Sequence, residues 1–393
     1  MEEKLITIHY SELGLKKGNR GFFEQHLLNN IKMAVKDLPI DKVVRDYGRF
    51  FIELNEDSPV ETVIERLKDV IGIAYFSVAY RGNPDVEILK EQILEKLSQE
   101  SFETFAIDTR RADKQFPLTS VEVNQIVGER IHTALNKPAN LKKPDLRCRI
   151  EIYNKKVMFS YQRIEGLRGL PVRSAGTVVS LLSSGIDSPV ATYRMMTRGC
   201  KIVPVHFHSY PFTDKSTYHN AIQLAKHLTR FQNSTKFYLV PLAKIQEAII
   251  ANSPAKLRLI LYRRAMLRLA EMIAIHEKAL ALVTGESVGQ VASQTLENIA
   301  VISDVVSMPM LRPLIGMDKE MIIEQAKAIG TFETSIEPYD DCCSFLVPQN
   351  PETRAQLEKV EEAELKIENM PELLAQSLEQ AEIMKLRYPP TDS

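Results

Sequence analysis

The chain passes from a strand to a helix at Val178-Val179-Ser180-Leu181-Leu182-Ser183-Ser184-Gly185-Ile186-Asp187-Ser188-Pro189-Val190. The aliphatic run ends in two serines and a glycine, and a helical pattern follows the acid, the serine and the proline. This order predicts a buried parallel strand, a tight loop and a helix N-terminus. Free backbone N–H groups at such a corner form a binding site for phosphate.

Strands and helices alternate downstream of this corner. We expect strands at 178–182, 201–207, 236–240 and 279–284, and helices near 189–198, 216–229, 243–251, 256–276 and 319–329. The alternation predicts an α/β domain with a doubly wound parallel sheet, whose ligands bind beyond the carboxyl ends of the strands. The last forty-odd residues should form two helical segments that cap this domain and carry no chemistry.

Two smaller domains are expected upstream. A strand–helix–strand–strand–helix–strand order over residues 1–76 predicts a ferredoxin-like α+β domain, with Ser58 as the cap of its second helix. Residues 77–168 should form a second α+β domain, which contains a hairpin that turns at Asn154-Lys155. The α/β domain would then cover residues 169–393.

Composition limits the class of protein. The 393 residues carry a net charge of −1, with 44% hydrophobic and 26% charged residues, as is typical of a globular protein. We find no signal region and no apolar run long enough to span a bilayer, so we expect a cytoplasmic protein with no membrane partner. The four cysteines, Cys148, Cys200, Cys342 and Cys343, do not have zinc-ligand spacing.

Basic residues gather in one part of this nearly neutral chain. Between residues 137 and 168 there are nine Lys or Arg residues against three acids, which favours a polyanion-binding face over a merely solvated hairpin. The candidate contacts there are Lys142, Lys143, Arg147, Arg149, Lys155 and Lys156. Lys16, Lys17 and Arg20 could also contact phosphate, although a solvated loop is the simpler interpretation of that segment.

The corner at 183–188 resembles the PP-loop (SGGxDS) of the ATP pyrophosphatases, which split ATP into AMP and pyrophosphate to adenylate a carbonyl oxygen. Ser184 departs from that pattern, which has glycine there. If the position needs a positive φ, a serine costs on the order of 1 kcal/mol. Without a ligand, the same residues would be an ordinary strand–turn–helix corner.

Two further segments extend the resemblance to most of the chain. The segment 140–151 resembles the closing half of a THUMP domain, a domain that binds RNA. The segment 283–298 contains Gly285 and Gln294. With the PP-loop, these segments resemble the tRNA 4-thiouridine synthetase (tRNA sulfurtransferase) family, in a form without the C-terminal rhodanese domain. The resemblance implies ATP contacts at Leu181, Leu182, Ser183, Ser184, Gly185, Asp187, Ser188, His206, Phe207, Arg263, Gly285 and Gln294.

Several of these residues also have simpler interpretations. Asp187 could cap the following helix, but we favour a role in holding Mg²⁺ against pyrophosphate. His206 and Phe207 could be ordinary packing at a strand end. Arg263 could lie on a solvated helix face, and Arg264 could be the nucleotide contact instead.

The segment 338–345 matches the place where the family keeps its sulfur-handling cysteine. A persulfide on Cys342 or Cys343 would be a strong nucleophile, and we prefer Cys342, although the pair could also be buried small hydrophobes. The resemblance implies a cysteine desulfurase as sulfur donor and a local resolving thiol, with Cys343, Cys200 and Cys148 as candidates. It also implies a link to thiamine thiazole synthesis through a sulfur-carrier protein, and it leaves a homodimer open.

The reaction that the resemblance implies is adenylation of O4 of a tRNA uridine, at position 8, followed by displacement of AMP by sulfur to give 4-thiouridine. One alternative is a PP-loop amidotransferase or amide ligase that acts on a small molecule. Another is a THUMP RNA-binding protein whose ATP site has decayed.

Overall fold

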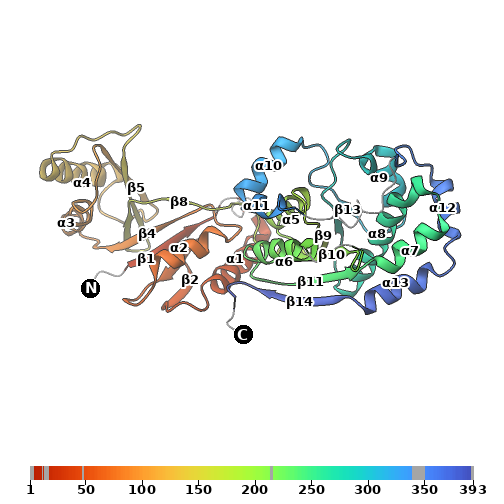
Figure 1. Cartoon of the computed structure of the whole chain (residues 1–393). Coiled ribbons are helices and arrows are strands. Elements are labelled where there is room, and N and C mark those ends of the chain that lie inside the picture. Colours follow the sequence, from red (N-terminus) through yellow and green to blue (C-terminus); the bar gives the residue numbers. More distant parts are fainter. Residues whose placement is uncertain are drawn as a thin grey trace. The chain divides into compact units, whose positions relative to one another are not determined.

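The computed structural model describes residues 4–10, 12, 17–46, 48–212, 216–338 and 350–390, and it divides into two compact units, Met1–Gly169 and Leu170–Ser393. Figure 1 labels the elements of both units. None of the helices in the described parts of the chain is both long and apolar enough to cross a lipid bilayer.

The first unit is built on one eight-stranded sheet with the order β2-β3-β1-β4-β7-β6-β5, in which β8 also pairs with β4. Strand β4 joins the two halves, because it pairs antiparallel with both β1 and β7. The elements are β1 (Lys4–His9), a 3-10 helix (Lys17–Asn19), α1 (Arg20–Ala34), β2 (Lys42–Asp46), β3 (Arg49–Glu53), α2 (Val60–Lys68), β4 (Tyr75–Gly82), α3 (Val86–Leu97), β5 (Phe105–Arg111), α4 (Ser120–Leu135), β6 (Leu146–Tyr153), β7 (Lys156–Ser160) and β8 (Ile164–Glu165).

Local sequence explains the boundaries of several of these elements. Asn154 and Lys155 both have positive φ, as a two-residue hairpin turn between β6 and β7 requires, so the predicted hairpin is confirmed. A capping box between Thr119 and Glu122 starts α4. The predicted Ser58 cap is wrong: Pro59 holds the N-cap position of α2, and the Ser58 hydroxyl donates to the Pro39 carbonyl at 2.6 Å.

The second unit contains a six-stranded sheet with the order β13-β12-β9-β10-β11-β14. All neighbours pair parallel except β14, which is antiparallel to β11 at one edge. The elements are β9 (Thr177–Leu181), α5 (Asp187–Thr197), β10 (Lys201–His208), α6 (Ser216–Thr229), β11 (Ser234–Pro241), α7 (Ala243–Asn252), a 3-10 helix (Ala255–Leu257), α8 (Arg258–His276), β12 (Leu282–Val283), a 3-10 helix (Ala292–Gln294), α9 (Leu296–Ser303), β13 (Met310–Leu311), α10 (Lys319–Ala328), α11 (Phe332–Ser335), α12 (Leu357–Leu365), α13 (Met370–Glu379) and β14 (Glu382–Arg387).

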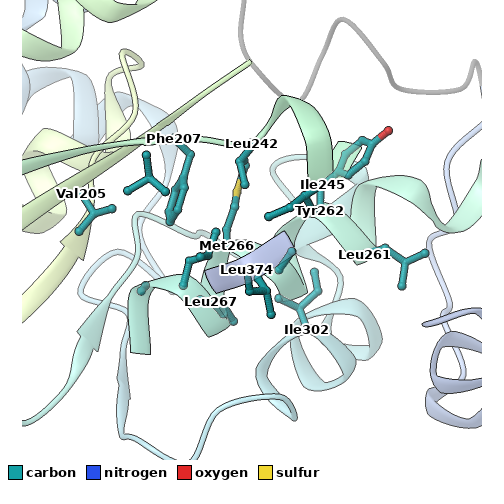
Figure 2. Packing of buried hydrophobic residues seen from close by; sticks show 14 of the residues in the cluster. Val205, Phe207, Leu242, Ile245, Leu261, Tyr262, Met266, Leu267, Ile302 and Leu374 are labelled. Carbon is teal, nitrogen blue, oxygen red and sulfur yellow. The ribbon is translucent and has the colours of Figure 1, made fainter. Parts of the chain in front are cut away.

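Helices cover both faces of this sheet, as expected for a doubly wound α/β fold. Helices α5, α6, α10 and α11 pack against one another, and α7, α8, α9, α12 and α13 form the other layer (Figure 1). Val205, Phe207, Met266 and Ile302 belong to the large apolar cluster between the sheet and the second layer, and Figure 2 shows Met266 beside the Phe207 ring.

The C-terminal segment differs from the prediction. Two helices, α12 and α13, do form, but the chain then adds β14 to the sheet edge. Most side chains of β14 are exposed, so the segment lacks the buried alternation that identifies a strand in a sequence. Backbone hydrogen bonds to β11 determine this strand, and no sequence pattern reports them.

Candidate functional site

All residues predicted to contact ATP line one cavity of about 350 Å³ in the second unit. It lies where β9, β10 and β12 end, at the carboxyl edge of the parallel sheet. Sequence reasoning did not assign a role to the remaining lining residues, which are Val205, Met266, Thr284, Glu286, Gln290 and Val291.

Hydrogen bonds between Ser183 and Ser188 close the loop after β9. The Ser188 hydroxyl oxygen accepts from the Ser183 N–H at 2.8 Å and lies 2.9 Å from the Ser183 hydroxyl. The Gly185 N–H donates to the Ser183 hydroxyl at 3.3 Å. Ser184 is buried, and it is not among the described residues with positive φ. The strain considered for a serine at this position is therefore absent from this described loop.

Asp187 is the first residue of α5, and its carboxylate does not cap that helix. Ile186 occupies the N-cap position, so the interpretation of Asp187 as the cap is wrong. One carboxylate oxygen accepts from Lys319 Nζ at 2.6 Å, and the other accepts from Gln290 Nε2 at 2.8 Å. Asp187 thus joins the loop to α10 and to the segment after β12.

Gly285 lets the end of β12 approach the same loop. A Cβ atom there would lie 2.8 Å from the Ser188 backbone nitrogen and 2.9 Å from its Cα. Both contacts are with backbone, which cannot move aside as a flexible side chain can. The absence of a side chain at Gly285 therefore admits the start of α5.

The opposite wall of the cavity comes from β10 and α8. His206 Nδ1 lies 2.9 Å from the Leu182 carbonyl oxygen, which can only accept, so the ring donates from Nδ1. Phe207 packs in the apolar cluster. Arg263 lines the cavity, whereas Arg264 is buried and donates to the Val301 carbonyl at 2.6 Å and to Glu364 at 3.0 Å.

A buried carboxylate in the cavity wall was missed by sequence reasoning. Glu286 is 4% exposed and accepts hydrogen bonds from Thr284, Arg312 and Arg263. Its position after Gly285 at a strand end was the only signal in the sequence. Lys319 and Arg312 carried no such signal, because they reach the site from the start of α10 and from the residue after β13.

Arginines gather on one face of the sheet in the first unit. Ile107, Cys148 and Ile150 pack against α3 and α4, so their strand neighbours Arg110, Arg147 and Arg149 point to the opposite face. His9 on β1 lies directly opposite Tyr75 on β4 in the same sheet.

Two aromatic rings of this face lie near arginines. The His9 and Tyr75 rings stack at 4.4 Å, and the Arg163 guanidinium lies 3.9 Å from the Tyr75 centroid. Burial, together with Arg49, Arg110 and other nearby arginines, lowers the pKa of His9 to about 3. His9 therefore stays neutral among these arginines, and the Glu151 carboxylate lies 3.8 Å from its Nε2.

The other predicted RNA contacts have diverse environments. Lys142 and Lys143 lie on an exposed turn held by Asn140, whose side-chain oxygen accepts from both backbone N–H groups. Lys155 is in the hairpin turn, and Lys156 pairs with Asp46 at 2.8 Å. Arg20 pairs with Glu24 at 2.9 Å. Lys16 and the Lys17 side chain lie outside the described residues.

The described cysteines are poor candidates for thiol chemistry. Burial raises the pKa of the Cys148 thiol to about 12 and also raises that of Cys200. Both therefore stay protonated at neutral pH, and a thiolate is the competent nucleophile. Cys342 and Cys343 lie outside the described residues.

The described residues include no group of three His, Cys, Asp or Glu side chains that could hold a metal ion. Asp187 does offer carboxylate oxygens beside the loop. Because Mg²⁺ commonly binds one carboxylate together with phosphate oxygens, this single acid fits an ion that arrives with a nucleotide.

Three family models match the chain. "Thiamine biosynthesis protein (ThiI)" matches residues 173–369, "ThiI ferredoxin-like domain" matches 5–77, and "THUMP domain" matches 83–162. The probable tRNA sulfurtransferase of Brevibacillus brevis is 42% identical and covers 94% of both chains. That of Thermus thermophilus is 40% identical over 99% of this chain and 95% of its own.

A solved structure agrees with these relatives. A 4-thiouridine synthetase in complex with RNA and ATP has a TM-score of 0.90 and 36% identity, and the match covers 98% of this chain and 100% of that one. Sequence and structure thus agree over nearly the whole length of the chain, which belongs to the ThiI family of tRNA sulfurtransferases.

Proposed function

We propose that this protein uses ATP to convert a uridine of tRNA, by family resemblance the one at position 8, into 4-thiouridine. The observation that carries the proposal is the single cavity that collects all the residues expected to contact ATP. The division of labour would follow domains at 1–76, 77–168 and 169–393, with RNA held by the first two and chemistry performed in the third.

The first step would be adenylation. O4 of the uracil forms a bond to the α-phosphorus of ATP, the bond to the β-phosphate oxygen breaks, and the N3 proton is lost to solvent. Loop N–H groups and Lys319 would stabilise the charge that grows on the leaving pyrophosphate. Asp187 would hold Mg²⁺, which supplies further charge neutralisation when bound.

Sulfur transfer would follow at the paired cysteines. The terminal sulfur of a Cys342 persulfide forms a bond to C4, and AMP leaves. The Cys343 thiolate then attacks the inner sulfur, which releases 4-thiouridine and leaves a disulfide for a cellular thiol to reduce. The burial of Cys148 and Cys200 argues against either as the resolving thiol.

The persulfide sulfur would come from a cysteine desulfurase in the cytoplasm. We also propose that the same persulfide can supply a sulfur-carrier protein for thiamine thiazole synthesis, as the name of the matching family implies. A homodimer is compatible with either role.

The rival functions are less well supported. An amide ligase would leave the arginine-rich face of the first unit unexplained. A decayed ATP site was suggested only by Ser184, and its backbone conformation is not among the strained ones.

Purified protein tests the proposal directly. We expect pyrophosphate release that needs both ATP and unmodified tRNA, and 4-thiouridine in the product by mass spectrometry once a desulfurase and cysteine are added. Pyrophosphate release without tRNA, driven by a small amine or acid, would favour the amide ligase. No ATP turnover under any condition would favour the RNA-binding protein.

Separate serine variants test the sulfur step. Cys342→Ser should retain tRNA-dependent pyrophosphate release and lose thiolation, because only the second step needs the persulfide. Cys343→Ser should form the sulfur-linked intermediate but release product slowly. Cys200→Ser is the matched control and should behave as wild type. If only Cys343→Ser abolishes persulfide formation, the roles of the two cysteines are exchanged.

A further inference from the structure

Glu286 presents a carboxylate in the wall of a cavity proposed to hold a triphosphate. It follows Gly285 at the end of β12 and is 4% exposed. A negative charge at this place should repel the nucleotide unless neighbouring cations outweigh it. The partners of Glu286 show how that charge is used.

The two carboxylate oxygens have different partners. Oε2 accepts from Arg312 Nε at 2.7 Å and from the Thr284 hydroxyl at 2.8 Å, so two donors fix this oxygen. Arg312 also donates to Ser303 at the end of α9. Oε1 faces Arg263, whose Nη1 lies 3.5 Å away. Two donors thus fix Oε2, and Oε1 is left to accept from Arg263.

Arg263 lines the cavity, and its contact with Glu286 uses Nη1, which leaves the second edge of the guanidinium outside this ion pair. The edge consists of Nε and Nη2, which can bind two oxygens of one anion side by side. Nε is buried and lacks a hydrogen-bond partner among the described residues, so an anionic oxygen that reached this edge would satisfy an otherwise unpaired donor. Two arginines around one glutamate leave a net positive charge at this wall.

We propose that Glu286 is a positioning residue: anchored by Arg312 and Thr284, it orients Arg263 so that the Nε–Nη2 edge meets an anionic oxygen of the nucleotide. The inference rests on the proposed function, because it takes the ligand to be ATP. It assigns Glu286 no contact with the reacting atoms and no proton transfer.

A double-mutant cycle tests the assignment. Glu286→Gln keeps the size of the side chain but loses the charge, and we expect kcat/KM for pyrophosphate release to fall roughly 10- to 100-fold, the range for a hydrogen bond to a charged group. For Arg263→Met, kcat/KM should fall by at least the same factor. The double variant should be no worse than Arg263→Met alone, since Glu286 acts through Arg263. The proposal would be overturned if the loss of kcat/KM in the double variant equalled the product of the two single losses. Unchanged kinetics in Glu286→Gln would also overturn it.

Two controls separate positioning from stability and from the proposed function. Thr284→Val removes one of the two donors to Oε2 and keeps the shape of the side chain. It should raise KM for ATP by less than Glu286→Gln does, and it replaces Glu286→Gln in the test if that variant does not fold. Thermal unfolding of each variant, with tRNA retention on a filter, reports folding independently of ATP. If the wild-type protein turns over no ATP, the proposed function fails. If the wild-type protein turns over ATP but the two single losses multiply in the double variant, only the positioning role fails.

Discussion

At the scale of single residues, the site combines neighbours in the sequence with residues from distant segments. Ser183, Gly185 and Ser188 lie within six consecutive residues where β9 passes into α5, so a motif could reveal them. Lys319 and Glu286 come from other elements, and only the folded chain brings them to the loop. The sequence therefore predicted the residues that lie together at this corner, and it did not reveal the charged groups that surround them.

Asp187→Ala should abolish tRNA-dependent pyrophosphate release and leave tRNA retention on a filter unchanged. The variant removes the carboxylate that Lys319 and Gln290 hold beside the loop, and with it the proposed magnesium ligand. We expect a loss of about 10²-fold or more, as for removal of one preorganised electrostatic group. Asp85→Ala is the control: it removes the N-cap of α3 in the other unit and should turn over ATP normally. Intact turnover in Asp187→Ala would refute the role.

At the scale of elements, the cavity depends on how closely β12 approaches the start of α5. The strand itself is only two residues long, Leu282–Val283, although the apolar run predicted a longer one. Side-chain pattern reports where a segment is buried, but hydrogen-bonded pairing decides how much of it is strand. The same reason explains why β14 was not predicted. Its backbone hydrogen bonds to β11 make it a strand, whereas its mostly exposed side chains show no strand pattern.

Gly285→Ala should weaken ATP binding while the protein stays folded. The added methyl would meet the Ser188 backbone at 2.8 Å and push the loop away from β12. Such overpacking costs roughly 1–3 kcal/mol, which corresponds to a drop in affinity of about 5- to 150-fold if the strain is relieved in the loop. Equilibrium dialysis with labelled ATP measures it. Gly316→Ala is the matched control, because nothing lies within 4 Å of its Cβ position, and it should bind as wild type. Equal affinities for both variants would mean that the close approach does not shape the site.

At the scale of the whole molecule, a chain of net charge −1 must bind a polyanion through local charge. The sequence predicted the basic segment and the hairpin but not which face carries the charge. The continuous sheet of the first unit settles that point for the described strands, because alternation places Arg110, Arg147 and Arg149 opposite α3 and α4. Arg49 and Arg163, from distant segments, both lower the pKa of the half-buried His9.

Charge reversal at Lys142 and Lys143 should weaken tRNA binding and flatten its dependence on salt. Each phosphate contact releases about 0.9 of a counterion, so losing both should lower the slope of log K against log salt by roughly 1 to 2. The backbone of this turn is held by Asn140 and not by the lysine side chains, so the fold should survive. Lys90→Glu on α3, on the face opposite the arginines, is the control and should leave the slope unchanged. A uniform loss of affinity with an unaltered slope would mean that these lysines shape the turn without touching phosphate, and the RNA contact would then fall to the arginines of the sheet.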